Sequence, residues 1–340
     1  MRPPIPPSVP QPPSARQATR LSGFDPHAMR EALQEGVLEH VQLEVGQFQG
    51  TVAHSASREI QVDWGNYSLS VMALGALNRN RITMGMLLSG HVDWRLFGAA
   101  VDNGLLVVAP EGSELALRLP TQPQWVSLQV ERERLDAIGV DPGSITRSGG
   151  LRLAGGSDAM LRTLHYWSAV LLASGAADNT AADETGNAAA DTASAQLALA
   201  HEDILSVMLG ELNGRQGPPT TTGHSAFLDA GERWRIVRRA QDFLDAQDSP
   251  LVRIDDLCQA ARTSLSTLER AFQEAFGCSP RRFLILRRMA AVRRELLRAG
   301  PSASVTEIAT RWGFFHLGRF AMEYAKLYHE RPSDTLHRRA

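Results

Sequence analysis

Residues 254–279 read IDDLCQAARTSLSTLERAFQEAFGCS, and this stretch decides the fold of the last third of the chain. Apolar residues recur there at helical spacing on both sides of a polar break at residues 262–264. Gly277 follows the second apolar run, where a residue that readily takes a positive φ ends a helix, and Pro280 stands where a new helix can begin. The stretch therefore predicts a helix, a tight turn and a second helix.

The same pattern returns at residues 305–330, which read VTEIATRWGFFHLGRFAMEYAKLYHE, with a break at residues 313–316. Between the two units, residues 279–299 carry apolar residues at helical spacing and arginines on the other faces, which predicts one long helix. We therefore expect an all-α C-terminal domain, residues 227–340, in which one helix holds two helix-turn-helix units at a set distance.

This region resembles the DNA-binding domain of the AraC/XylS family of transcription regulators. The residues that carry the resemblance are Leu268, Arg270, Phe272 and Gly277 in the first unit and Ile308, Ala309, Gly313, Phe314, Phe320, Tyr324 and Pro332 in the second. The run HLGRFAMEYAKLYHERPSDTL is most similar to the branch that contains XylS-type activators of aromatic-acid catabolism and ethanolamine-operon regulators. His329 departs from the family pattern because it stands where the second unit usually has Gly, so the end of that helix is in question.

In a helix-turn-helix unit the second helix enters the major groove with its exposed N-terminal residues on the base edges. The candidates for base readout are Ser266, Thr267, Glu269, Arg270 and Gln273 in the first unit and His316, Leu317, Gly318, Arg319 and Met322 in the second. Arg270 can bind guanine O6 and N7 with both guanidinium nitrogens. The alternative is that Arg270 contacts a phosphate or pairs with Glu274 at i+4.

The second unit offers fewer hydrogen-bonding groups, since Leu317 and Met322 can give only apolar contacts. We therefore expect the first unit to carry more direct readout and the second more positioning. Phosphate contacts are expected near helix ends. The candidates are Arg262, Ser264, Arg281, Arg282 and Lys326. Two units on one helix predict contacts about ten base pairs apart, and a dimer predicts a direct-repeat operator on double-stranded DNA.

Charge is distributed unevenly along the 340 residues, a length that predicts about two domains. Residues 227–340 hold 20 Arg and Lys against 14 Asp and Glu, a net of +6, whereas the first 226 residues have a net of −8. The basic C-terminal third is therefore the nucleic-acid candidate. No apolar run is long enough for a membrane helix and no signal peptide is evident, so we expect a cytoplasmic protein that does not bind membranes.

From about Gly36 to Leu135 apolar and polar side chains alternate in short runs separated by Gly, Asn, Asp or Pro, which is typical of an antiparallel sandwich or barrel and predicts a β-rich sensor domain at residues 21–140. The family resemblance implies a cupin-like barrel that binds an effector at this position, and the whole chain is then an α+β multidomain protein. The effector-site candidates are Trp64, Tyr67, Arg81, Trp94 and Arg95. An arginine could pair with an effector carboxylate, although aromatic side chains in strands are more often core and arginines more often surface.

Three further segments complete the predicted domain plan. Residues 1–20 hold seven prolines and are expected to form a disordered tail. Residues 141–213 predict two amphipathic helices, at 157–173 and 195–213, with a mobile Ala-rich loop at 174–195 between them. These helices either pair two subunits, as the resemblance implies, or pack on the barrel. Residues 214–226 are expected to be the interdomain linker.

Enzyme activity is not expected, and we predict no catalytic residue, metal or cofactor. A cupin dioxygenase needs clustered His and Glu ligands, but His54 and His91 stand alone. Cys258 and Cys278 match neither a CxxC metal site nor a disulfide framework. A DNA-repair alkyltransferase would need a reactive cysteine before Cys258, and none is present.

The leading hypothesis is a transcription activator that a small-molecule effector controls through the N-terminal domain. Its expected partners are DNA, RNA polymerase, an effector and a second copy of the chain. The alternative is a transcription factor whose N-terminal domain binds a protein or only dimerises. The sequence does not indicate which compound the effector is.

Overall fold

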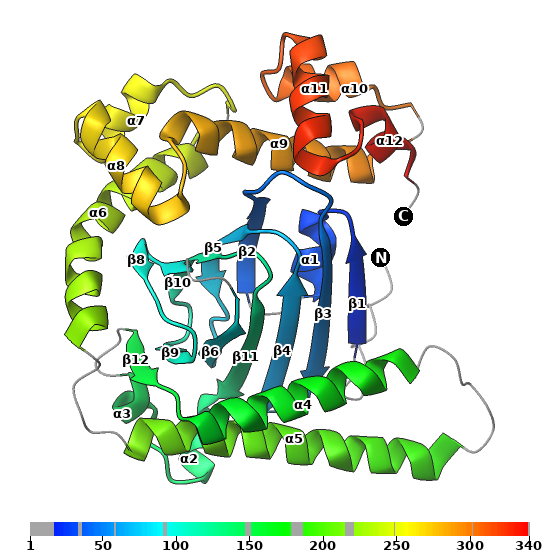
Figure 1. The fold of residues 1–340 in the computed structure, drawn as a ribbon, viewed down its shortest axis with the longest axis vertical. Helices are drawn as coiled ribbons and strands as arrows, with labels where there is room; N and C mark the ends of the chain where they lie inside the picture. Colours follow the sequence, from blue (N-terminus) through cyan, green and yellow to red (C-terminus); the bar gives the residue numbers. More distant parts are fainter. Residues whose placement is uncertain are drawn as a thin grey trace, which may run out of the picture.

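The structure is a computed structural model that describes residues 17–32, 36–57, 59–90, 94–146, 151–177, 186–214, 221–247, 249–300 and 302–338. Two β-sheets lie at the centre of the molecule, with two long helices below them and the C-terminal helices above (Figure 1). The prediction of an antiparallel β N-terminal part and a helical C-terminal part with two helix-turn-helix units is confirmed.

All strand pairs in the two sheets are antiparallel. The larger sheet contains, in spatial order, β1 (Gln17–Ser22), β3 (Gln49–Ala56), β4 (Ile60–Tyr67), β11 (Gln124–Glu131), β6 (Arg81–Ser89), β9 (Leu105–Ala109) and β12 (Arg152–Gly155). The smaller sheet contains β2 (Gly36–Gln42), β5 (Val71–Leu77), β10 (Glu114–Leu119), β7 (Arg95–Leu96) and β8 (Ala99–Ala100). Alternation along each strand gives the larger sheet two different faces, because successive side chains point to opposite sides.

The outer face of the larger sheet is covered by α4 (Asp158–Ala177) and α5 (Gly186–Gly214) (Figure 1). Val62 of β4, Met84 of β6 and Leu128 of β11 form one apolar cluster with the side chains of these helices. The α5 members of the cluster are Leu197, Ala200, Ile204, Leu205, Met208, Leu209 and Leu212. The apolar stripe that we predicted for dimerisation or packing therefore packs within the chain.

Three predicted boundaries need correction. The Pro-rich tail was expected to run to residue 20, but β1 begins at Gln17 and pairs with β3; residues 1–16 lie outside the described residues. Helix covers both ends of the loop expected at 174–195, because α4 reaches Ala177 and α5 begins at Gly186; residues 178–185 lie outside the described residues. Alanine is the strongest helix former, so this Ala-rich sequence extends both helices. The linker expected at 214–226 gives way to helix from Thr221.

Short helices complete the N-terminal part: α1 (Pro26–Ala32), α2 (Arg132–Ala137) and α3 (Pro142–Thr146). The C-terminal part contains α6 (Thr221–Asp245), α7 (Ile254–Ala261), α8 (Leu265–Phe276), α9 (Pro280–Arg298), α10 (Val305–Arg311), α11 (Leu317–Tyr328) and α12 (Pro332–His337). The two helix-turn-helix units, α7–α8 and α10–α11, lie at opposite ends of α9 (Figure 1). No described helix is both long and apolar enough to cross a membrane.

Local sequence sets the ends of these helices. The Ser264 hydroxyl caps α8 by accepting a hydrogen bond from the Thr267 amide at 3.3 Å, and Gly277 ends α8 at a φ of 70°. Ser279 and Pro280 start α9 in the same manner. His329 ends α11 at a φ of 57°, so it adopts the left-handed conformation that Gly usually supplies.

Candidate nucleic-acid interface and effector cavity

The N-terminal half of α8 is an exposed polar edge. Leu268 and Phe272 are buried, which turns the other side of the helix toward solvent. All five residues predicted to read bases in this unit are exposed: Ser266, Thr267, Glu269, Arg270 and Gln273. Glu274, the alternative partner of Arg270, pairs instead with Arg233 of α6. Arg270 forms no ion pair with any residue that the structure describes, so its guanidinium is available for a base or a phosphate.

The N-terminal half of α11 is equally exposed but less polar. The predicted readers His316, Leu317, Gly318, Arg319 and Met322 are all exposed. Met322 has 69% of its surface exposed, whereas the Arg319 guanidinium donates to Glu323 at 2.8 Å. This edge therefore offers mainly apolar contacts and one arginine that already has a partner.

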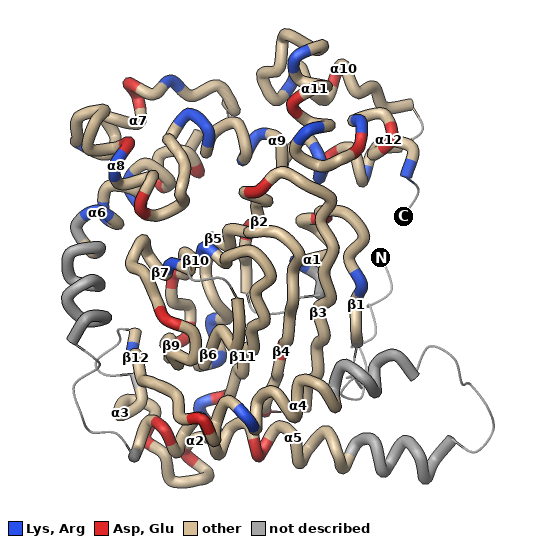
Figure 2. Tube along the Cα trace, in the orientation of Figure 1, with Lys and Arg blue, Asp and Glu red and all other residues tan. Residues whose placement is uncertain are grey.

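The residues predicted to contact phosphates lie around these two edges. Arg262, Ser264, Arg281 and Lys326 are exposed, and Arg282 is half-buried. Lys and Arg residues are spaced along α9 and beside the two units, at the end of the molecule opposite α4 and α5 (Figure 2). Arg287 and Arg293 of α9 already pair with carboxylates, so it is the exposed cations beside the two units that suit the backbone of a nucleic acid.

The C-terminal end of α8 rests on the smaller sheet. Gly98, beside β8, approaches Ala275 so closely that a Cβ on this glycine would lie 3.5 Å from the Ala275 Cα. The Arg118 guanidinium covers Gly277, and a Cβ there would lie 2.5 Å from the arginine Nη1. The N-terminal domain therefore holds the end of α8 that is opposite the reading edge.

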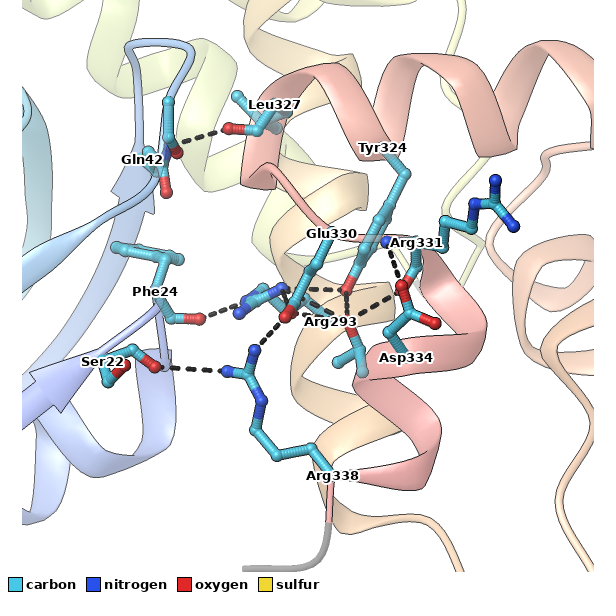
Figure 3. Close-up of polar contacts among 12 residues, drawn as sticks. Ser22, Phe24, Gln42, Arg293, Tyr324, Leu327, Glu330, Arg331, Asp334 and Arg338 are labelled. Atoms are coloured by element: carbon cyan, nitrogen blue, oxygen red, sulfur yellow. Dashed lines mark hydrogen bonds and ion pairs between the residues drawn. The ribbon is translucent and has the colours of Figure 1, made fainter.

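The C-terminal end of α11 also contacts the N-terminal domain, but through hydrogen bonds (Figure 3). The Leu327 carbonyl accepts from Gln42 Nε2 at 2.9 Å and from the Gly46 amide at 3.2 Å. Nearby, Phe24 stacks on Tyr328 with ring centroids 6.2 Å apart. Both recognition helices thus meet the N-terminal domain with their C-terminal ends and leave their N-terminal ends exposed.

Arg293 of α9 is the centre of this second contact. Its side chain has no exposed surface, and it donates to the Phe24 carbonyl, to Glu330 and to the Tyr324 hydroxyl (Figure 3). Nearby carboxylate and phenol groups outweigh the burial of this guanidinium and raise its pKa, so it stays charged. Arg338 extends the network by bonding Glu330 and the Ser22 carbonyl.

Sequence reasoning placed Arg293 on an outward face of the long helix, and the structure corrects this assignment. Spacing could have shown that Arg293 lies on the buried face of the helix. It follows Met289 by four residues and precedes Leu296 by three, and both of these residues are buried. A charged residue in that stripe needs a partner, and here the partners come from α11, α12 and the N-terminal domain.

A cavity of about 100 Å³ lies between the two sheets. Its lining comes from both sheets: Leu38, His40, Tyr67, Ala73, Leu77, Thr83, Gly85, Met86, Leu87, Trp94, Leu96, Val107, Ala109, Leu115, Leu117, Leu119, Trp125, Val126, Ser127 and Leu151. Two of the five residues predicted for an effector site, Tyr67 and Trp94, belong to this lining. A mostly apolar space with a few polar groups has the usual composition of a small-molecule site.

The other three candidates lie elsewhere. Trp64 is in the apolar cluster on the opposite face of the larger sheet. Arg81 pairs with Glu131 at 3.0 Å, and Arg95 donates to the Gly98 carbonyl at 3.2 Å. The arginine that we expected to pair with an effector carboxylate is therefore not in the described lining, because both guanidinium groups are bound at the strand edges.

Strand β2 lies between the cavity and the C-terminal domain. Leu38 and His40 point into the cavity, and Glu39 between them pairs with Arg287 of α9 at 3.2 Å. Alternation along the strand explains this division. A change at the cavity wall can therefore reach α9 through a single strand.

Among the described residues no group of three His, Cys, Asp or Glu side chains is placed to hold a metal ion. Burial raises the pKa of the Cys278 thiol to about 11. Slight burial and nearby carboxylates raise that of Cys258. Both thiols therefore stay protonated and unreactive at neutral pH.

Comparison with known families identifies the C-terminal part. The sequence profile of the helix-turn-helix domain family matches residues 257–338. The "Probable thc operon regulatory protein" of Rhodococcus erythropolis is 42% identical over 102 residues, which are 30% of this chain and 31% of that protein. The "XylDLEGF operon transcriptional activator 3" of Pseudomonas putida is 39% identical over 108 residues, 31% of each chain. The match thus spans about a third of these curated relatives.

Solved structures resemble the whole chain only distantly. The AraC-like transcriptional activator CuxR is 11% identical with a TM-score of 0.35, and the match covers 83% of this chain and 96% of CuxR. ToxT from Vibrio cholerae O395 is 14% identical with a TM-score of 0.29, covering 82% of this chain and 98% of ToxT.

Proposed function

Residues 257–338 form a helix-turn-helix domain of the AraC/XylS type, and from this premise we propose that the chain is a sequence-specific DNA-binding transcription regulator. The observation that carries the proposal is the arrangement of the two recognition helices. Each is fastened to the β domain at its C-terminal end and exposes the N-terminal residues that can meet base edges. DNA can therefore approach without removal of the N-terminal domain.

In this proposal the first unit reads bases and the second mainly positions the protein. Arg270 is free to bind guanine and Glu269 to accept from cytosine N4, whereas Arg319 is held by Glu323. Arg262, Ser264, Arg281, Arg282 and Lys326 bind phosphates. The two units occupy successive major-groove segments about ten base pairs apart, and a dimer on a direct-repeat operator doubles this pattern.

The N-terminal domain is the sensor. A small molecule in the cavity presses on β2 and, through Glu39 and Arg287, changes how firmly α9 and the two units are held. The regulator then acts as an activator that contacts RNA polymerase. The cavity supports this hypothesis over the alternative that the β domain binds only a protein, because a pure interaction module has no need of an internal space with polar groups.

Selection of binding sites from a random double-stranded DNA library by the purified full chain tests the proposal. We expect one enriched motif with two conserved segments about ten base pairs apart, and tighter binding to it than to a scrambled sequence by at least about a thousandfold at fixed salt. Absence of any enriched motif would contradict the proposed function. A chain with Arg270→Ala serves as the matched control, because it keeps the fold and loses one base contact.

A further inference from the structure

The cavity between the sheets gathers buried polar atoms that have no partner. In the part of the chain that the structure describes, five residues of its lining each have a buried polar side-chain atom without a hydrogen bond. These atoms are His40 Nδ1, Thr83 Oγ1, Trp94 Nε1, Trp125 Nε1 and Ser127 Oγ. Buried polar groups in folded proteins are nearly always hydrogen-bonded, so five around one space indicate that something is bound there in the functional state.

The chemistry of these atoms describes the missing partner. The two indole nitrogens can only donate, the two hydroxyls can donate or accept, and the imidazole nitrogen does one or the other according to its tautomer. A bound molecule therefore meets donors and adaptable groups on a wall that is otherwise aliphatic and aromatic. This combination suits an apolar body that carries a hydroxyl, carbonyl or amide group.

The described lining contains no charged side chain. His40 is its one residue that could carry a charge near neutral pH, but burial, with a smaller contribution from the Arg30 charge, lowers its pKa to about 4. The imidazole is therefore neutral at pH 7. An ionised ligand would lose its water and gain no counter-charge, which strongly disfavours its entry.

The volume limits the size of the ligand. An apolar cavity of about 150 Å³ holds one benzene molecule, and this cavity measures about 100 Å³. One small ring, with slight movement of the surrounding side chains, is the largest body that fits.

We propose that the cavity binds an uncharged molecule of about one ring that carries at least one hydrogen-bonding group, and that it rejects carboxylates and ammonium compounds. This inference rests on the proposed role of the β domain as an effector sensor, and it names the chemical class of the effector. It also replaces our expectation of an effector carboxylate paired with an arginine.

Four probes of one shape test the charge rule: benzamide and benzyl alcohol, which are neutral, and benzoate and benzylammonium, which are charged. Binding to the purified full chain is measured by ligand-observed NMR at millimolar concentration and by the shift in melting temperature. We expect a neutral probe to bind at least about tenfold tighter than either charged one, because the charged probes lose hydration without a partner. Equal or tighter binding of benzoate or benzylammonium overturns the proposal, and so does failure of both neutral probes, which would mean that ordered water satisfies the polar atoms.

A cavity-filling variant shows where the probe binds. Gly85 of β6 lines the cavity, and a Cβ there would have only the Val126 carbonyl oxygen near it, at 3.9 Å. Gly85→Val therefore places a side chain in the empty space without a backbone clash, and Val suits a strand. We expect it to abolish probe binding while the thermal unfolding transition stays cooperative.

The matched control is Gly210→Ala on α5, because a Cβ at Gly210 has nothing within 4 Å and lies far from the lining in sequence and fold. It is expected to leave probe binding unchanged. Retained binding in Gly85→Val would place the probe outside the cavity and overturn the proposal.

The same probes in a binding assay on the selected operator separate this inference from the proposed function. If the operator is bound but only a charged compound changes the affinity, the regulator function stands and the charge rule is wrong. If no operator is selected, the regulator function fails, while the NMR comparison of neutral and charged probes still decides the ligand class.

Discussion

The two helix-turn-helix units share one local plan and differ in what they present and how they are held. The first presents Ser, Thr, Glu, Arg and Gln on α8 and rests on the smaller sheet by close packing at Gly98 and Gly277. The second presents His, Leu, Gly, Arg and Met on α11 and is held through directional hydrogen bonds around the buried Arg293. Two units with the same fold can therefore contribute differently to DNA recognition.

Hydrogen bonds at the Leu327 carbonyl and at Arg293 orient the second unit, because their strength depends on the angle between donor and acceptor. In the proposed function the first unit carries most of the sequence readout and the second unit positions the protein. Five substitutions can break or sharpen this comparison.

Arg293→Met is expected to have the largest effect, a loss of about 3 kcal/mol or more in the free energy of unfolding. The substitution removes a charge on which Glu330, Tyr324 and the Phe24 carbonyl depend, and it leaves these buried groups short of a partner. Urea unfolding measures the change, with Arg294→Met on the next, partly exposed position as the control. If the two variants differ by less than about 1 kcal/mol, the second unit is not anchored as we describe.

Arg270→Ala is expected to weaken binding to the selected operator by about 1–3 kcal/mol and to relax the preference at one base pair. The measurement is a fluorescence anisotropy titration on the operator and on a scrambled sequence at one salt concentration. An equal loss on both sequences would show that Arg270 contacts only a phosphate.

Arg319→Ala in the second unit is expected to cost less than about 1 kcal/mol of binding free energy on the same operator, since the guanidinium must break its ion pair with Glu323 before it can bind DNA. The same titration gives the value. A loss as large as that of Arg270→Ala would reverse the assignment of readout to the first unit.

The helix ends give the smallest expected effect. His329→Gly is expected to stabilise the protein by about 0.5–1 kcal/mol, because a residue with a Cβ pays for the left-handed conformation at a φ of 57°. Gly277→Ala, at a φ of 70°, is expected to destabilise by at least as much, because its Cβ would also displace the Arg118 guanidinium. Thermal unfolding compares the two, and a destabilised His329→Gly would mean that the imidazole makes a contact worth more than the strain.

Sequence periodicity located both units and correctly predicted that all ten candidate readers are exposed, because the buried face of a short helix is a local property of the pattern of Leu268, Phe272, Phe320 and Tyr324. Periodicity could not predict contacts between residues that are far apart in the sequence. Nothing local to Arg293 says that the Phe24 carbonyl, 269 positions away, accepts its hydrogen bond.

The sequence predicted two of the residues that line the cavity between the sheets. Tyr67 and Trp94 alternate with polar neighbours in predicted strands, which indicates that their side chains are buried. Burial alone does not tell whether a side chain lies on the cavity face or on the helix-covered face of the larger sheet. Trp64 was assigned to the wrong face for this reason. Arg81 and Arg95 were candidates because a guanidinium can hold a carboxylate. The sequence could not show that both are already bound, because their partners Glu131 and Gly98 become neighbours only when the sheets form.

The most direct measurement is the affinity of the full chain for every single-base-pair variant of its selected operator, repeated with Arg270→Ala. We expect base-pair changes in one major-groove segment to cost about 1–3 kcal/mol of binding free energy each, and changes in the segment about ten base pairs away to cost less. In Arg270→Ala, the cost at one position of the first segment is expected to disappear. Equal preferences in both segments, or a profile that Arg270→Ala leaves unchanged, would contradict the division of work between the two units.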